Sequence, residues 1–222
     1  KKYPSLRITA KYTIIYNYRK YLLFKMVRTN SMFLELGFQL PSFKIFNANS
    51  HDGQYYNSSQ LDNRHLLLMF ICAHCPFVKY IENQISLLSK DFENVVQTIA
   101  VSSNDILTHP SDSPENLRKQ AQSLGWSFPY LYDSDQSFAK ELKAACTPDF
   151  YLFSNEGNRN FELYYHGQFD DSRPSNDIPI TGKDLLSAIT NLDQKNSYPL
   201  NQIPSLGCNI KWTQGKEPDW FK

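Results

Sequence analysis

The chain has 222 residues, of which 41% are apolar, 20% charged and 14% aromatic. This length suits one domain with a substantial core, with or without a tail. The net charge of +1 is the sum of two regions with opposite charge, because residues 1–34 hold eight bases and no acid. The rest holds 15 bases against 22 acids, and this formal charge of −7 argues against nucleic-acid binding by the fold itself.

The first 25 residues are basic and rich in tyrosine, and they do not begin with Met. We expect residues 1–30 to be an N-terminal extension that is either disordered or not part of the native protein, with Met26 as the true start. An organelle-type presequence and a basic arm are the alternatives. A single folded domain is expected over residues 31–200, and a tail that packs on it over residues 201–222.

Patterns of apolar residues predict alternating strands and helices. The continuous run LLLMFIC is typical of a central strand that is covered on both faces. Ser113 and Thr181 are suitable N-caps, and Pro76 suits the first turn of a helix. In chain order we expect an edge strand over 41–48, a strand over 66–72, a helix over 76–93, a strand over 95–102, a helix after Ser113, a strand over 128–133, a helix over 136–145, a hairpin of 149–153 with 161–169, and a helix over 181–192.

This order predicts an α/β fold. A strand–helix–strand unit requires a right-handed crossover and therefore a parallel strand pair, whereas the hairpin adds antiparallel strands. We therefore expect a mixed central sheet with helices on both faces. Open α/β sheets bind their ligands at the carboxyl ends of the strands, where Cys72 and Cys75 are expected to lie.

Cys72 and Cys75 form a C-x-x-C pair between the central strand and the following helix. A helix N-terminus stabilises a thiolate, and the second thiol of such a pair donates a hydrogen bond to the first. Protonated His74 would favour the thiolate further. We expect Cys72 to be the more exposed nucleophile and Cys75 to be the resolving thiol inside the first helical turn. The alternative is that both are small buried hydrophobic residues.

Several stretches, taken in order, resemble the redoxins of the alkyl hydroperoxide reductase/thiol-specific antioxidant type. The chain is similar to their peroxiredoxin-like, thioredoxin-domain branch over about residues 36–212. The resemblance implies a thioredoxin fold and an antioxidant, thiol-based redox activity. The matching stretches are LGFQLPSFKI, MFICAHCPFVKYIE, FPYLYDSDQSFAKEL, ACTPDFYLF, GQFDDSRPSN and PSLGCNIKW.

In thioredoxin-like proteins a loop with a cis-proline faces the dithiol. The matching position here is Thr147-Pro148, so the resemblance implies a cis bond there and a Thr147 backbone that is presented to substrate. The peroxidase motif P-x-x-x-[ST]-x-x-C fits neither cysteine, because Leu68 or His65 stands at the Pro position. The buried acid of thioredoxin is also missing, since Leu66 stands six residues before Cys72.

The other two cysteines are additional candidate thiols. Cys146 is expected near the dithiol, where it would pack at a helix end, form a second disulfide or join Cys72, Cys75 and His74 in a metal site. Cys208 would dock the tail, or resolve a sulfenate on Cys72 if the tail folds over the site. The run DDSR at 170–173 is expected to be a solvated, ion-paired turn or a contact with a partner protein.

The sequence predicts an oxidoreductase that exchanges thiols and disulfides through Cys72 and Cys75, supported by His74, Pro76, Thr147 and Pro148. A thiol peroxidase and a non-enzymatic redox-sensing or metal-binding module remain the alternatives. Expected partners are protein or small-molecule thiols and disulfides, and peroxide in the peroxidase alternative. No cofactor, bound metal, nucleic acid or membrane is expected. We expect a monomer or homodimer in the cytoplasm, because four cysteines without a secretory signal indicate a reducing compartment; organelle targeting remains open if residues 1–25 are native.

Overall fold

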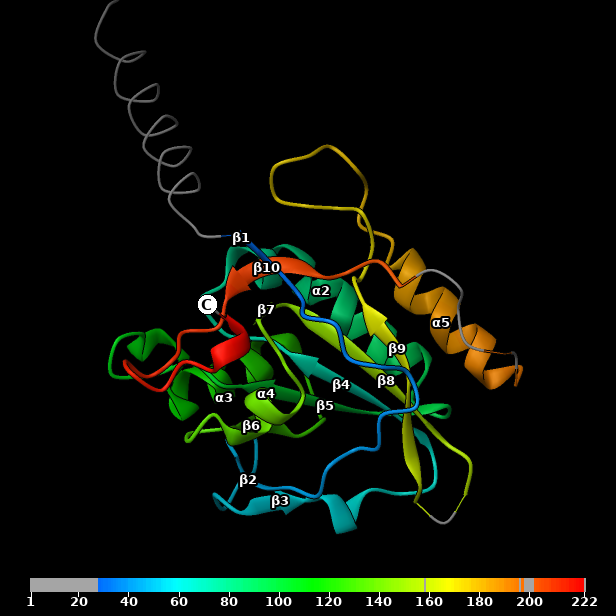
Figure 1. The fold of residues 1–222 in the computed structure, drawn as a ribbon, viewed down its shortest axis with the longest axis horizontal. Helices are drawn as coiled ribbons and strands as arrows, with labels where there is room; N and C mark the ends of the chain where they lie inside the picture. The colour runs from blue at the N-terminus through cyan, green and yellow to red at the C-terminus, as the bar shows by residue number, and fades with distance from the viewer. Residues whose placement is uncertain (1–27, 158, 196, 198–201, 222) are drawn as a thin grey trace, which may run out of the picture.

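A computed structural model describes residues 28–157, 159–195, 197 and 202–221. Its centre is a seven-stranded mixed sheet, which confirms the predicted fold class (Figure 1). The inner pairs β4–β5 and β5–β6 are parallel, and the other pairs are antiparallel. In sheet order the strands are β3 (Tyr55–Asn57), β2 (Lys44–Asn47), β6 (Tyr130–Tyr132), β5 (Val96–Ser102), β4 (His65–Phe70), β8 (Asp149–Asn155) and β9 (Phe161–Gly167).

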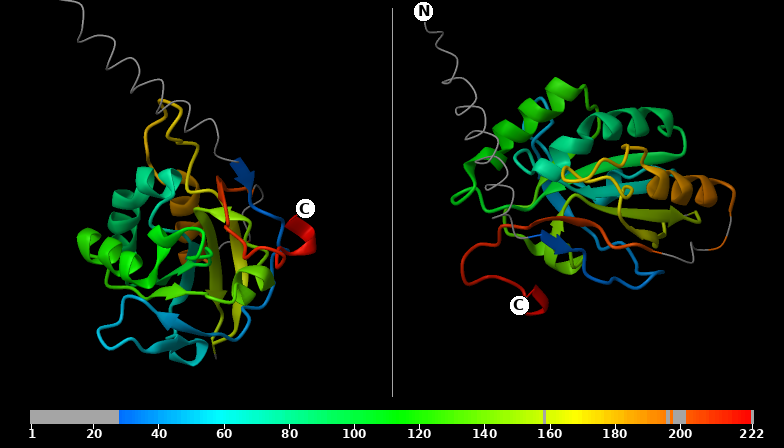
Figure 2. Two further views of the ribbon diagram at one scale, coloured as in Figure 1. Left: turned by 90° about the vertical axis from the view of Figure 1, so that its left-hand side faces the viewer. Right: turned by 90° about the horizontal axis from the view of Figure 1, so that it is seen from above.

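Helices cover both faces of this sheet (Figures 1 and 2). On one face α2, α3 and α5 pack against the sheet, and on the other face lies the short α4, together with segments from the beginning and end of the described chain. The bounds are α2 (Pro76–Asp91), α3 (Pro114–Leu124), α4 (Ser137–Glu141) and α5 (Lys183–Asp193), with 3-10 turns η1 (Ser58–Gln60), η2 (Pro110–Asp112) and η3 (Asp219–Phe221). None of the described helices is long and apolar enough to cross a membrane.

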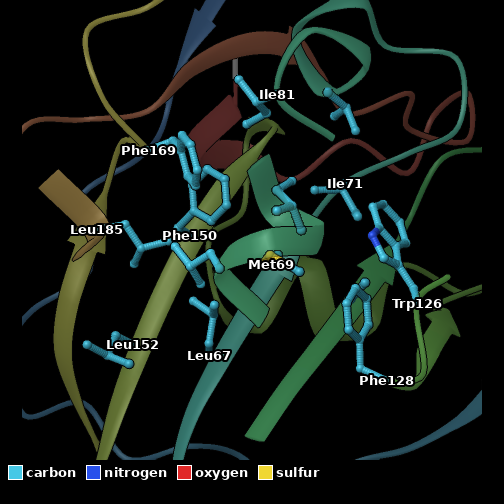
Figure 3. Packing of buried hydrophobic residues seen from close by; sticks show 14 of the residues in the cluster. Leu67, Met69, Ile71, Ile81, Trp126, Phe128, Phe150, Leu152, Phe169 and Leu185 are labelled. Carbon is cyan, nitrogen blue, oxygen red and sulfur yellow. The ribbon is translucent and has the colours of Figure 1, made fainter. Parts of the chain in front are cut away.

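Two apolar cores follow from the alternation of side chains along β4. Leu67 and Met69 face α2, α3 and α5, whereas Leu66, Leu68 and Phe70 face α4 and the terminal segments. Figure 3 shows the first core between the sheet and its helices. A strand that is buried on both faces must be apolar throughout, which is why its sequence is a continuous apolar run.

The element that positions the dithiol is α2. Its apolar positions Phe77, Ile81 and Ile85 are all buried, and Pro76 stands in its first turn as predicted. Cys75 is the N-cap residue, in extended conformation. The strand β4 and the helix α2 therefore fix the dithiol from both sides.

A second, three-stranded sheet was not predicted. It consists of β1 (Arg28–Asn30), β10 (Leu206–Asn209) and β7 (Cys146–Thr147), all antiparallel. Residues 28–30, which the sequence places in an extension, thus pair with β10, while residues 1–27 lie outside the described residues. Figures 1 and 2 show β1 and β10 lying side by side next to β7.

Three local predictions were wrong. The strand over 41–48 is not at the edge, because β3 pairs with its outer side. The helix expected over 136–145 ends at Glu141, and Lys143 has a positive φ of 52°. Helix α5 is capped by Gly182 rather than Thr181, because Asp170 accepts hydrogen bonds from the N–H groups of both residues.

Candidate active site

The dithiol lies at the carboxyl end of β4, as predicted. Cys72 follows the strand directly after Ile71, and Cys75 caps α2. Both side chains are fully buried, with 0% exposure. The expectation that Cys72 is the more exposed thiol was therefore wrong, because Thr147 packs against both sulfurs.

Thr147 connects the two sulfurs. Its Oγ1 lies 3.5 Å from the Cys72 Sγ, and its carbonyl accepts a hydrogen bond from the Cys75 thiol at 3.2 Å. The Thr147–Pro148 peptide bond is cis, as predicted. The loop before β8 therefore presents its backbone to the dithiol.

An acid that the sequence analysis missed organises the C-A-H-C turn. The Asp112 Oδ1 accepts hydrogen bonds from the N–H groups of Ala73 at 2.9 Å and His74 at 3.1 Å. Its Oδ2 lies 2.5 Å from the His74 Nδ1 and accepts a hydrogen bond from the Asn104 side chain at 2.7 Å. The Asp112 side chain is fully buried in η2. In the sequence, the only signal near Asp112 was the neighbouring Ser113, which was predicted to cap a helix.

These contacts define the charge on Asp112. Burial raises the pKa of its carboxyl, but the hydrogen bond and charge of His74 and the hydrogen bond from Asn104 outweigh burial and hold the pKa below its usual range. Asp112 is therefore an anion that orients the imidazole of His74. The His74 Nδ1 also lies 3.7 Å from the Cys72 Sγ, and the ring packs 5.3 Å from that of His109.

Of the two thiols, Cys75 is the one that ionises more readily. Burial raises its pKa, but hydrogen bonds with Cys208, Cys72, Thr147 and the Val78 N–H outweigh burial and bring the pKa well below its ordinary value. Burial raises the pKa of Cys72, and the neighbouring Cys75 and Asp112 raise it further. The sequence analysis expected the stabilised thiolate on Cys72, and it did not foresee the anionic Asp112 beside that sulfur.

The two remaining cysteines have different surroundings. Cys208 lies on β10, is 4% exposed and hydrogen-bonds with Cys75. The Cys146 sulfur lies 3.8 Å from the Pro148 carbonyl and 3.9 Å from that of Ser205. The described residues thus bring Cys208, and not Cys146, into contact with the dithiol.

The residues that could ligate a metal differ from the set that the sequence suggested. Ligand atoms of Cys72, His74 and Asp112 lie within 4.8 Å of one another. Both Asp112 oxygens already accept hydrogen bonds from the protein, and the His74 Nδ1 faces one of them. The arrangement fits a histidine–carboxylate pair beside a thiol, with its donors and acceptors satisfied by one another.

The DDSR run is in part the solvated, ion-paired turn that was expected, since Asp171 forms an ion pair with Lys183 at 2.9 Å, whereas Asp170 and Ser172 are buried. Asp170 is 1% exposed and accepts hydrogen bonds from the N–H groups of Ser172, Thr181 and Gly182. It holds the segment after β9 against the start of α5, so its role in the described structure is to fix the backbone.

The chain is similar to known proteins of one family. The model of the AhpC/TSA family matches residues 36–158. None of the curated proteins compared with the chain matches it.

Solved structures give a closer likeness. An uncharacterized conserved protein from Geobacillus kaustophilus is 42% identical, with a TM-score of 0.80 over 86% of this chain and 98% of that one. A hypothetical protein from Sinorhizobium meliloti 1021 is 37% identical, with a TM-score of 0.79 over 84% of this chain and 100% of that one.

A more distant structure shows the fold alone. A thioredoxin-like protein from Aeropyrum pernix is 18% identical, with a TM-score of 0.51 over 68% of this chain and 89% of that one. The family match covers more than half of the chain, and the two structures with 42% and 37% identity match most of the chain and share its fold. The chain belongs to the AhpC/TSA family of redoxins and has a thioredoxin-like fold.

Proposed function

We propose that the protein is a thiol–disulfide oxidoreductase whose Cys72 and Cys75 alternate between a dithiol and a disulfide. The observation that carries this proposal is the contact of both sulfurs with Thr147, beside the cis-proline and at the N-terminus of α2. Both sulfurs contact Thr147, and the Cys75 side chain also acts on the pKa of Cys72, which supports a disulfide between the two.

The turn that contains Cys72 is where a substrate enters. Ala73 and His74 are partly exposed, whereas the Cys75 sulfur faces Thr147 and Cys208 in the interior. We therefore assign the attack on a substrate disulfide to Cys72. Because the Cys72 thiol hydrogen-bonds with Cys75, its proton passes to Cys75 as Cys72 attacks.

Reduction of a substrate disulfide then takes two exchange steps. The Cys72 thiolate attacks one sulfur of the substrate disulfide, forms a mixed disulfide and releases the first substrate thiolate, which takes the proton from Cys75. The Cys75 thiolate attacks the Cys72 sulfur, breaks the mixed disulfide and releases the second substrate thiolate, which is protonated by water. The protein is oxidised by two electrons and the substrate disulfide is reduced.

Pro148 also lines a small cavity of about 20 Å³, which is roughly the room of one water molecule. Its lining includes Phe77, Phe150, Arg173 and Leu206. The proposed partners are protein or small-molecule disulfides and thiols in a reducing compartment such as the cytoplasm. Peroxide is not the proposed substrate, because neither cysteine carries the Pro and Thr that activate it in the peroxidase motif.

The test is a redox titration of the purified protein against glutathione, followed by alkylation and peptide mapping. We expect a reversible Cys72–Cys75 disulfide with a potential of roughly −120 to −270 mV, the range of known dithiol oxidoreductases. A Cys75→Ser variant should accumulate mixed disulfides on Cys72. Over-oxidation of Cys72 to sulfinate, without reversible pairing, would show that the protein does not exchange disulfides.

A further inference from the structure

Cys208 is placed against the dithiol by strand pairing. In the register of β7 and β10, Cys208 stands opposite Thr147, the residue that contacts both Cys72 and Cys75. The neighbouring Gly207 allows this approach, since a Cβ on it would lie 2.0 Å from the Thr147 carbonyl oxygen. Any side chain at position 207 would therefore move β10 away from the dithiol.

Cys75 is the partner that the other two thiols share. Its side chain hydrogen-bonds with Cys72 and with Cys208. Cys208 is almost fully buried, so the three thiols are closed off from solvent. Cys146, on the same strand as Thr147, faces the Pro148 and Ser205 carbonyls instead and offers a matched control.

We propose that Cys208 is a third redox-active thiol, which takes over the disulfide from Cys72 by attacking Cys75. This proposal rests on the proposed function, because it begins with the Cys72–Cys75 disulfide. The Cys208 thiolate attacks the Cys75 sulfur, the Cys72–Cys75 bond breaks and a Cys75–Cys208 bond forms. Cys72 leaves as a thiolate and takes up the proton that Cys208 gave up. The number of disulfides does not change, so the step needs no further oxidant.

The electrostatics favour this order of events. In the reduced protein the hydrogen bond with Cys75, burial and the Cys75 charge all raise the pKa of Cys208, while Lys211 lowers it. Formation of the Cys72–Cys75 disulfide removes the Cys75 charge and its hydrogen bond. Cys208 then ionises more readily, at the moment when its neighbour has become an electrophile.

The consequence is a second oxidised state with Cys72 free. In that state the disulfide lies in the interior between α2 and β10, and the entry turn carries a reduced thiol. Cys72 can then form a second mixed disulfide while the first oxidising equivalent is stored in the protein.

The test uses the full chain and its Cys72→Ser variant. Both are oxidised with diamide, trapped with acid and alkylated under denaturing conditions, and their disulfide-linked peptides are mapped. We expect the variant to form an intramolecular Cys75–Cys208 disulfide, and the wild type to give both this pairing and Cys72–Cys75. Adding Cys208→Ser to the variant should abolish intramolecular pairing, whereas adding Cys146→Ser should leave it unchanged.

The outcomes separate the two proposals. If the wild type forms Cys72–Cys75 reversibly, but neither it nor the variant forms Cys75–Cys208, the third thiol is ruled out and the proposed function stands. If the wild type forms no Cys72–Cys75 disulfide, the proposed function fails. Should the Cys72→Ser variant not fold, as judged by circular dichroism, the pairing in the wild type alone decides the question.

Discussion

Asp112 is the residue on which the shape of the dithiol turn depends. It accepts hydrogen bonds from two consecutive N–H groups, from His74 and from Asn104, with no exposed surface. Replacement by Asn would remove the charge and set an NH2 group against these donors. We expect Asp112→Asn to lower the free energy of unfolding by about 2–5 kcal/mol, as measured by urea denaturation.

The same variant tests the electrostatic role of Asp112. Because its charge raises the pKa of Cys72, Asp112→Asn should lower that pKa relative to wild type, as measured by the pH dependence of Cys72 alkylation. The matched control is Asp105→Asn in the same loop, whose carboxylate bonds with Leu107 and Thr108. An unchanged alkylation profile in a folded Asp112→Asn protein would contradict the assigned role.

The ionisation of Cys75 can be followed by the ultraviolet absorbance of its thiolate. Reduced wild-type protein should show a thiolate that titrates well below the ordinary cysteine pKa of 9.0, and Cys75→Ser should lose it. The folded pKa is lower than the unfolded one, so the stability from this group is present above the unfolded pKa and is lost as pH falls through the folded pKa. Retention of the low-pH thiolate in Cys75→Ser would place the charge on another cysteine.

The element that covers the dithiol is β10, and Gly207 is its closest approach to β7. A Cβ at this position would lie 2.0 Å from the Thr147 oxygen and 2.5 Å from the Thr147 carbonyl carbon. We expect Gly207→Ala to lower the free energy of unfolding by about 1–3 kcal/mol, because it forces the strands apart. The same variant should increase the rate of Cys75 alkylation, which mass spectrometry measures.

Gly125 offers a control for this substitution. It has a φ of +65° at the C-cap of α3, with open space around its Cβ position. Gly125→Ala should therefore cost stability through backbone strain alone and leave the alkylation rate in the native state unchanged. Equal alkylation in both variants would mean that β10 does not shield Cys75.

Elements with strong local signals were predictable. Their signals come from residues that are close in the sequence. Examples are the apolar run of β4, the periodic apolar positions of α2 and the capping Ser113 of α3. Strands β7, β10 and β1 are two to four residues long, and their pairing depends on residues far apart in the chain. Asp112 escaped prediction for the same reason, since its partners become neighbours only after folding. The cysteines themselves were found because their spacing is local.

At the scale of the whole molecule the dithiol is closed off from solvent. Cys72 and Cys75 have no exposed surface. We expect iodoacetamide to label them at least about tenfold more slowly in the native protein than in denaturant, because labelling requires local opening. Time courses by mass spectrometry measure this ratio. Labelling of native Cys72 at the rate of the denatured chain would show that the sulfur is accessible without any opening.

The strand that carries Cys208 has a consequence for the growing polypeptide. The ribosome makes Cys72 and Cys75 early, and it makes β10, which completes their enclosure, only after all seven strands of the central sheet. Once β9 is complete, the nascent dithiol has Asp112 and the Thr147–Pro148 loop beside it, but not its cover. The dithiol of a newly synthesised chain therefore stays open to oxidants until β10 has been released.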